Sequence, residues 1–104
     1  MIFVEIKLIS TEKPTTVAII GRVDTVTAPD FQSKLESIIA RYPQDLLLDC
    51  SELGFLSSAG LRVLFLLARK AKAAHANVTL QSVAPNVREV LKISGFDTFF
   101  TVLD

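Results

Sequence analysis

The most constraining feature of the sequence is a run of three leucines, Leu46–Leu48, between two longer segments with helical periodicity. The run is too short for a helix of its own, and it is apolar on both faces of an extended chain. Such a segment is typical of a central strand that is covered on both sides. A strand between two helices is the repeating unit of α/β folds, so the sequence predicts a sheet with helices packed against it.

Hydrophobic periodicity and turn residues predict the elements before this strand. Over residues 2–9 an aliphatic residue stands at every even position and the charged Glu5 and Lys7 lie between them, a period of two that predicts a first strand. Residues 16–20 predict a second strand that pairs with it as an antiparallel hairpin, ends at Gly21 and leads into a loop at 21–24. The pattern from Thr27 to Asp30 is that of a capping box, so we expect Thr27 to cap a helix at about 28–41.

The same signals predict the second half of the chain. We expect the central strand at 45–50, a turn at 51–54 and a helix that begins near Ser57 or Ser58. A strand follows at 77–83, and Pro85 and Gly95 mark the two ends of a third helix. The tail at 98–103 is expected to form a short strand or helix that lays two phenylalanines on the core. The sequence therefore predicts a single α/β domain over residues 1–104, with a mixed sheet of four to five strands.

Composition narrows the class of protein. The 104 residues include 11 Lys and Arg against 11 Asp and Glu, and this balance argues against a non-specific nucleic-acid binder. The most apolar stretch, residues 53–68, is interrupted by Arg62 and is too short to span a membrane. Cys50 has no partner for a disulfide, and no Cys/His cluster has the spacing of metal ligands. We therefore expect a cytoplasmic protein without a metal or cofactor.

No catalytic site is expected either. A hydrolase could be imagined from Ser58, His75 and Asp49, but His75 lies roughly 25 Å further along the same predicted helix at 1.5 Å per residue. The Gly-x-Ser-x-Gly pattern of hydrolases is also absent, because Leu56 stands where the first glycine belongs.

Two serines at the start of the second helix are the strongest candidates for function. Ser57 or Ser58 is expected to cap the helix, because a serine oxygen accepts hydrogen bonds from the free N–H groups of a first turn. The free N–H groups of residues 59–61 and the helix dipole also favour a phosphate there. A phosphoserine at this place would add about −1.5 to −2 charge and change which partner fits the surface.

Three segments resemble the STAS domain of bacterial anti-sigma factor antagonists. The segment from Asp49 to Leu64, with Ser-Ser-Ala-Gly-Leu at its centre, is similar to the family signature. Gly21-Arg-Val-Asp24 followed by Thr27-Ala resembles the family's Gly-x-(L/V)-Asp loop, and residues 84–96 resemble its third helix. The resemblance covers essentially all 104 residues and implies the STAS fold.

The resemblance also implies a mechanism of partner switching. Aligned on Gly60, the residue phosphorylated in the family falls on Ser58, whereas the preceding aspartate of the family is replaced by Ser57. The unphosphorylated domain would bind an anti-sigma factor that is also a serine kinase, and this binding frees the sigma factor. Phosphorylation of Ser58 would release the partner, and a phosphoserine phosphatase would reset the switch.

The expected partner-binding residues are Asp24, Thr27, Ser57, Ser58, Gly60 and Arg62. Asp24 would shape the kinase contact, or would hold its own loop in an Asx turn. Gly60 would leave room for a neighbouring loop or for the partner. Arg62 would dock the partner or the phosphate, in a stretch from Leu53 to Arg88 without acidic residues, or would belong to a solvated face.

The alternative is a STAS subunit of a larger complex, such as a lipid-transport assembly at the inner membrane. In such a subunit the turn into the second helix would be a fixed interface, and the serine would never be modified.

Overall fold

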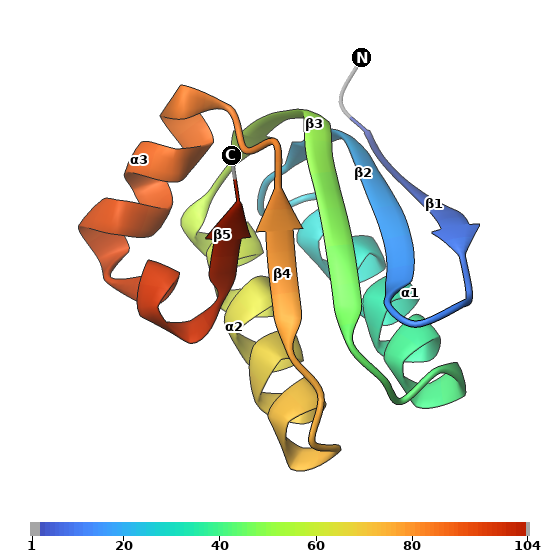
Figure 1. Ribbon diagram of the computed structural model, residues 1–104. Coiled ribbons are helices and arrows are strands. Elements are labelled where there is room, and N and C mark those ends of the chain that lie inside the picture. The colour runs from blue at the N-terminus through green and yellow to red at the C-terminus, as the bar shows by residue number, and fades with distance from the viewer. Residues whose placement is uncertain (1–2, 104) are drawn as a thin grey trace.

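The computed structural model describes residues 3–103 and contains one mixed sheet (Figure 1). The strands are β1 (Val4–Ser10), β2 (Thr15–Val23), β3 (Leu46–Leu56), β4 (Val78–Gln81) and β5 (Thr101–Leu103). They lie in the order β1-β2-β3-β4-β5, with β1 antiparallel to β2 and all other pairs parallel. The helices are α1 (Ala28–Arg41), α2 (Ser58–Ala73) and α3 (Pro85–Ser94), followed by the 3-10 helix η1 (Phe96–Phe99). The expected α/β class, mixed sheet and hairpin are confirmed.

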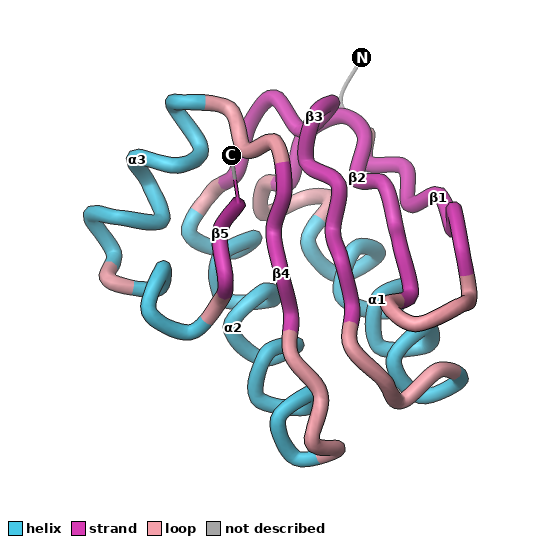
Figure 2. Tube along the Cα trace, viewed as in Figure 1, coloured by secondary structure: helices cyan, strands magenta, loops and turns pink. Residues whose placement is uncertain are grey.

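The helices leave one face of the sheet open. In Figures 1 and 2, α1 and α2 lie behind the sheet and α3 lies to the side of β5. The core therefore forms between the sheet and these helices, and its largest fully buried side chains are Phe31, Ile19, Leu35, Leu46, Leu48, Leu53, Leu64, Leu67, Leu80, Leu91, Val17 and Val23. The prediction that the leucine run is covered on both sides is wrong, because Leu47 points away from the helices and is partly exposed.

Two strands continue beyond the ends that the sequence suggested. Residues 21–23 and 51–54, expected as a loop and a turn, belong to β2 and β3, and β3 continues to Leu56. The two extensions pair with each other, with Arg22 opposite Phe55 and Val23 opposite Leu56. Each extension therefore supplies the pairing that the other needs. In contrast, β4 is shorter than the expected strand at 77–83.

The helix ends largely follow the sequence signals. The bounds of α1 agree with the expected range, and α3 ends at Gly95, whose left-handed backbone (φ 77°) suits glycine. The capping box is wrong, because the Thr27 side chain caps no α1 N–H group. Of the two phenylalanines expected on the core, Phe100 is buried, whereas Phe99 is 53% exposed and packs edge-on against Phe65.

Candidate functional site at the start of helix α2

Ser57 forms the junction between β3 and α2. Its backbone is extended, and its Oγ accepts a hydrogen bond from the N–H of Gly60 at 3.3 Å, so Ser57 is the N-cap of α2. Its own N–H donates to the carbonyl oxygen of Val23 at 2.8 Å. This bond fixes the start of α2 to the end of β2, and the expected serine cap is confirmed.

Ser58 is the first residue of α2, and its side chain is exposed. Within residues 3–103 its hydroxyl makes no hydrogen bond, unlike that of Ser57. The expected set of free N–H groups is smaller than predicted, because Ser57 already occupies the N–H groups of Gly60 and Leu61 through its Oγ and its carbonyl oxygen. The structure thus separates the two serines: Ser57 holds the helix start, and Ser58 presents an unused hydroxyl to solvent.

Gly60 is buried beneath this turn. A Cβ atom at Gly60 would lie 2.6 Å from Cδ1 of Leu56 and 2.8 Å from Cγ1 of Val23. Both distances are far below ordinary carbon contacts, so a side chain has no room. Of the two roles considered for Gly60, close packing against a neighbouring segment is the one that the structure shows.

Asp24 organises the loop between β2 and α1. Its Oδ1 accepts hydrogen bonds from the N–H groups of Val26 (2.9 Å) and Thr27 (3.0 Å), and its Oδ2 lies 3.3 Å from Nε of Arg22. The hydrogen bond from the Thr27 N–H has the largest effect on the pKa of Asp24 and lowers it. The Val26 N–H and Arg22 lower this pKa further. Asp24 is therefore a carboxylate that holds its own loop.

Thr27 is buried in the same loop, with 8% of its surface exposed. Its Oγ1 lies 3.0 Å from the carbonyl oxygen of Arg22 and accepts from the Asp24 N–H at 2.9 Å. Thr27 was expected among the partner-binding residues, and its burial leaves little of its surface for a partner. It acts inside the loop.

The expected proximity of the Asp24 loop and the Ser58 turn is confirmed by the bond between Val23 and Ser57. Three neighbours of this loop were not expected at the site: Arg22, which is partly exposed, and the exposed Phe55 and Val26. The Arg22 guanidinium lies 4.4 Å from the ring centroid of Phe55, and Val26 is 79% exposed. Arg22 and Phe55 are brought together by strand register, which no local pattern reveals, whereas the apolar Val26 in a polar loop was a visible signal.

Arg62 lies one turn after Ser58 on α2 and is exposed. Both residues line a shallow groove of about 550 Å³, together with Phe65 and Phe96. The groove is mostly apolar, and the Phe65 and Phe96 rings in it stack with their centroids 5.2 Å apart. Further along α2, Lys70 is paired with Glu36 at 2.8 Å, so the basic residues of this helix do not form one uniform patch.

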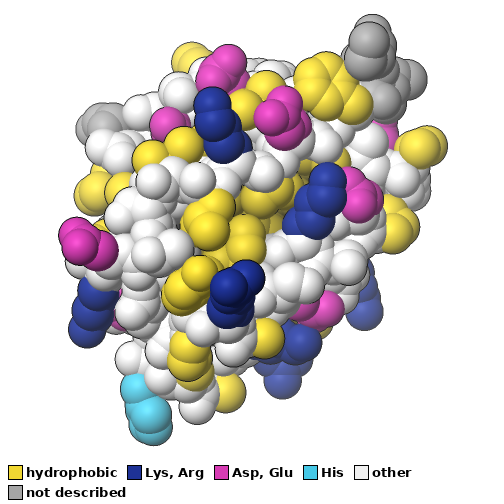
Figure 3. Space-filling model, turned by 90° about the vertical axis from the view of Figure 1, so that its right-hand side faces the viewer, with side chains coloured by type: hydrophobic (Ala, Val, Ile, Leu, Met, Phe, Trp, Pro, Cys, Tyr) yellow, Lys and Arg dark blue, Asp and Glu magenta, His cyan; other side chains and the backbone are white. Residues whose placement is uncertain are grey.

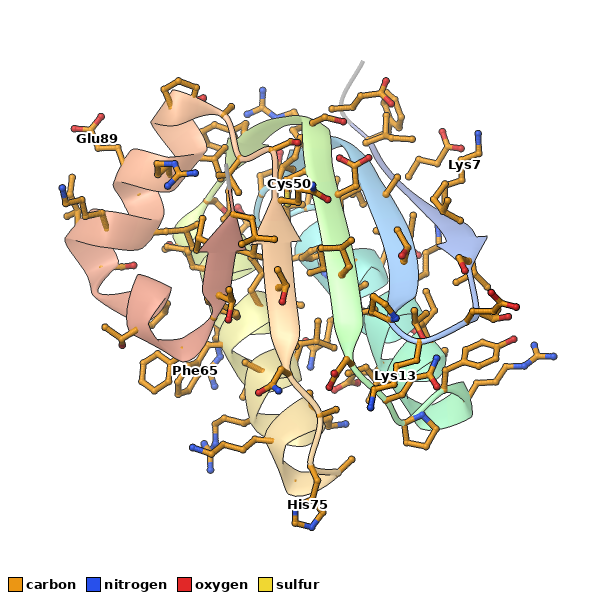
Figure 4. The ribbon with its side chains drawn as sticks, viewed as in Figure 1. Lys7, Lys13, Cys50, Phe65, His75 and Glu89 are labelled. Carbon is orange, nitrogen blue, oxygen red and sulfur yellow. The ribbon has the colours of Figure 1, made fainter. Side chains whose placement is uncertain are left out.

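Other reactive side chains lie apart from this site. Burial raises the pKa of Cys50 to about 12, so its thiol stays protonated. His75 lies at the far end of α2 from Ser58 (Figure 4). Among residues 3–103, His, Cys, Asp and Glu form no cluster that could hold a metal ion, and no helix is long and apolar enough to cross a membrane.

Comparison with known proteins places this geometry in a family. The sequence model of the STAS domain matches residues 5–104. BtrV of Bordetella bronchiseptica, a candidate anti-sigma factor antagonist, is 34% identical over 82 residues, which are 79% of this chain and 71% of BtrV. An anti-sigma factor antagonist structure from Mycobacterium paratuberculosis has a TM-score of 0.80 and 25% identity, covering 96% of this chain and 85% of that one.

The phosphorylated form of SpoIIAA, a Bacillus cell fate determinant, has a TM-score of 0.69 and covers 95% of this chain and 89% of its own. At 20% identity this likeness shows the fold alone. The match of the family model to nearly the whole chain, together with the identity to BtrV, shows that the chain belongs to the STAS domain family.

Proposed function

We propose that the chain is an anti-sigma factor antagonist that works by partner switching, with Ser58 as the phosphorylated residue. The observation that carries the proposal is the exposed, unbonded hydroxyl of Ser58 on the first turn of α2. The description of BtrV supports the antagonist role, and the phosphorylated form of SpoIIAA shows that this fold can carry a phosphate. The chain would act by binding and would itself catalyse nothing.

The proposed partner surface consists of exposed side chains at the start of α2, at the end of β3 and in the loop after β2: Ser58, Arg62, Phe55 and Val26. The other candidate residues support this surface from within. Ser57 and Gly60 fix the helix start, and Asp24 and Thr27 fix the loop that presents Val26. In the unphosphorylated state this surface would bind an anti-sigma factor that is also a serine kinase.

Phosphorylation would change the charge of this surface. The kinase would transfer the γ-phosphoryl group of ATP to Oγ of Ser58, so that a new O–P bond forms, ADP leaves and the hydroxyl proton is released. The product carries about −1.5 to −2 charge beside the apolar groove that Ser58 lines. A partner that buries this surface would have to desolvate that charge, so it would dissociate until a phosphoserine phosphatase removes the phosphate.

The test uses the anti-sigma factor/serine kinase of the same organism with ATP, followed by intact mass and peptide mass spectrometry. We expect one phosphate on Ser58 in the wild type and in Ser57→Ala, and none in Ser58→Ala. Binding to the same kinase without ATP should weaken at least tenfold in Ser58→Glu. Equal binding by Ser58→Glu, with no phosphate transfer, would instead indicate a fixed interface in a larger complex.

A further inference from the structure

The outer edge of the sheet is formed by β1, the first strand in the spatial order. Three large hydrophobic residues at this edge are exposed: Phe3 (40%), Leu8 (43%) and Ile9 (54%). Figure 3 shows this side of the molecule, where hydrophobic side chains gather at the centre with acidic and basic side chains around them. Figure 4 shows Lys7 on β1, pointing away from the other strands.

The backbone of β1 offers unpaired groups at this edge. The N–H of Arg22 donates to the carbonyl oxygen of Phe3, so Phe3 and Arg22 form a hydrogen-bonded antiparallel pair. Because these pairs alternate along a strand, Glu5 and Lys7 also direct their backbone groups toward β2. Val4, Ile6 and Leu8 therefore direct their N–H and C=O groups outward, where a further strand could pair.

The sequence of this edge is self-complementary. In an antiparallel pair of two β1 strands with a two-fold axis at Ile6, the outward-directed residues of each copy face those of the other. Val4 then lies opposite Leu8 of the second copy, and Glu5 lies opposite Lys7 of the second copy. A shift of the axis to Glu5 or Lys7 keeps the backbone pairing but places two like charges face to face.

We propose that the β1 edge is a self-association surface, on which a second copy of this chain pairs antiparallel about a two-fold axis at Ile6. The pair would join two five-stranded sheets into one continuous sheet. Such an interface is isologous, so each favourable contact occurs twice. The complementarity of Glu5 and Lys7 selects the register, and the exposed Leu8 and Ile9 supply apolar surface to bury. This surface does not depend on the proposed function of Ser58.

The first experiment measures the mass in solution by sedimentation velocity over a wide range of protein concentrations. We expect a monomer at low concentration and a dimer at high concentration. Glu5→Lys and Lys7→Glu should each weaken dimerisation at least tenfold, because each turns two opposite-charge pairs into two like-charge pairs. Lys13→Glu makes the same change of charge outside the paired residues and should leave dimerisation as in the wild type.

The decisive experiment mixes the two single variants. Glu5→Lys has two lysines at the edge of each chain and Lys7→Glu has two glutamates, so equal amounts should form a heterodimer that neither forms alone. The double variant Glu5→Lys/Lys7→Glu should recover the wild-type dimer. Thermal unfolding of each variant shows whether it is folded.

Two outcomes would overturn the proposal. A wild type that stays monomeric up to its solubility limit would show that Glu5 and Lys7 protect the edge from pairing. A dimer that persists unchanged in both charge-reversed variants would bury another surface. Hydrogen exchange gives an independent readout, because the Ile6 amide should become protected only at concentrations where the dimer forms.

Discussion

Gly60→Ala tests whether the start of α2 is held by close packing. In the middle of a helix this change stabilises by up to about 1 kcal/mol, because alanine is the better helix former. Here the new methyl group would lie 2.6 Å from Leu56 and 2.8 Å from Val23. Both side chains are buried, at 3% and 0% exposure, so neither can move into solvent. Overpacking of this kind costs about 1–3 kcal/mol.

Because both contacts lie below 3 Å and both neighbours are buried, we expect an overpacking cost at the upper end of this range, about 3 kcal/mol. After the helix gain of up to about 1 kcal/mol is subtracted, Gly60→Ala should lose about 2 kcal/mol. For a domain of this size each kcal/mol lowers the midpoint of thermal unfolding by about 4–8 °C. Urea unfolding gives the free energy, and the matched control is Gly54→Ala. A Cβ atom at Gly54 would have its nearest contact at 3.8 Å, so this variant should stay within about 0.5 kcal/mol of the wild type. A Gly60→Ala protein as stable as the wild type would refute the packing argument.

Four further variants separate the roles of the neighbouring residues. Ser57→Ala should cost about 1 kcal/mol in urea unfolding, whereas Ser58→Ala should cost less, because only Ser57 caps the helix. Thr27→Val should cost about 1–3 kcal/mol, because the partly buried N–H of Asp24 loses its acceptor. Asp24→Asn should be less stable than the wild type at neutral pH. Since the folded state lowers the pKa of Asp24, the stabilisation is complete above the unfolded pKa and is lost as the pH falls through the folded pKa. The difference in free energy of unfolding between the wild type and Asp24→Asn should therefore shrink below about pH 4. A difference that grew as the pH fell would contradict this reasoning.

The helices were predicted well because the residues that start, fill and end a helix are neighbours in the sequence. The apolar period, Pro29 and the stop before Pro43 suffice to place α1, and Pro85 with Gly95 suffices for α3. The ends of β2 and β3 were missed because each is extended by pairing with the other, some thirty residues away in the chain. The partial exposure of Leu47 was missed because a short apolar run fits both a sheet covered by helices on one face and a sheet covered on both faces.

The candidate site was predicted in part for the same reason. Ser57 and Ser58 follow a local cap pattern, but only the structure tells which oxygen is used. Asp24 was expected near them through the family resemblance, whereas its contact with Arg22 and the place of Phe55 depend on strand register. Thr27 was misassigned because the capping-box pattern ignores the carbonyl of Arg22, which lies 3.0 Å from the hydroxyl in the folded loop.

By the family resemblance, Ser57 stands where an aspartate is expected, and the geometry predicts what this difference does. A carboxylate at the N-cap of α2 would still accept from the Gly60 N–H, and its charge would interact favourably with the helix dipole. Ser57→Asp should therefore stabilise the unphosphorylated protein by about 0.3–1 kcal/mol, measured by urea unfolding at low salt.

The same charge would stand next to a phosphate on Ser58, and the two would compete for the positive end of one helix. We therefore expect phosphorylation of Ser58 to change the free energy of unfolding less favourably in Ser57→Asp than in the wild type. Ser57→Asn is the matched control, because it keeps a cap oxygen without the charge. An equal effect of phosphorylation on all three proteins would show that the phosphate on Ser58 points away from the helix end, and that Ser57 leaves the switch unaffected.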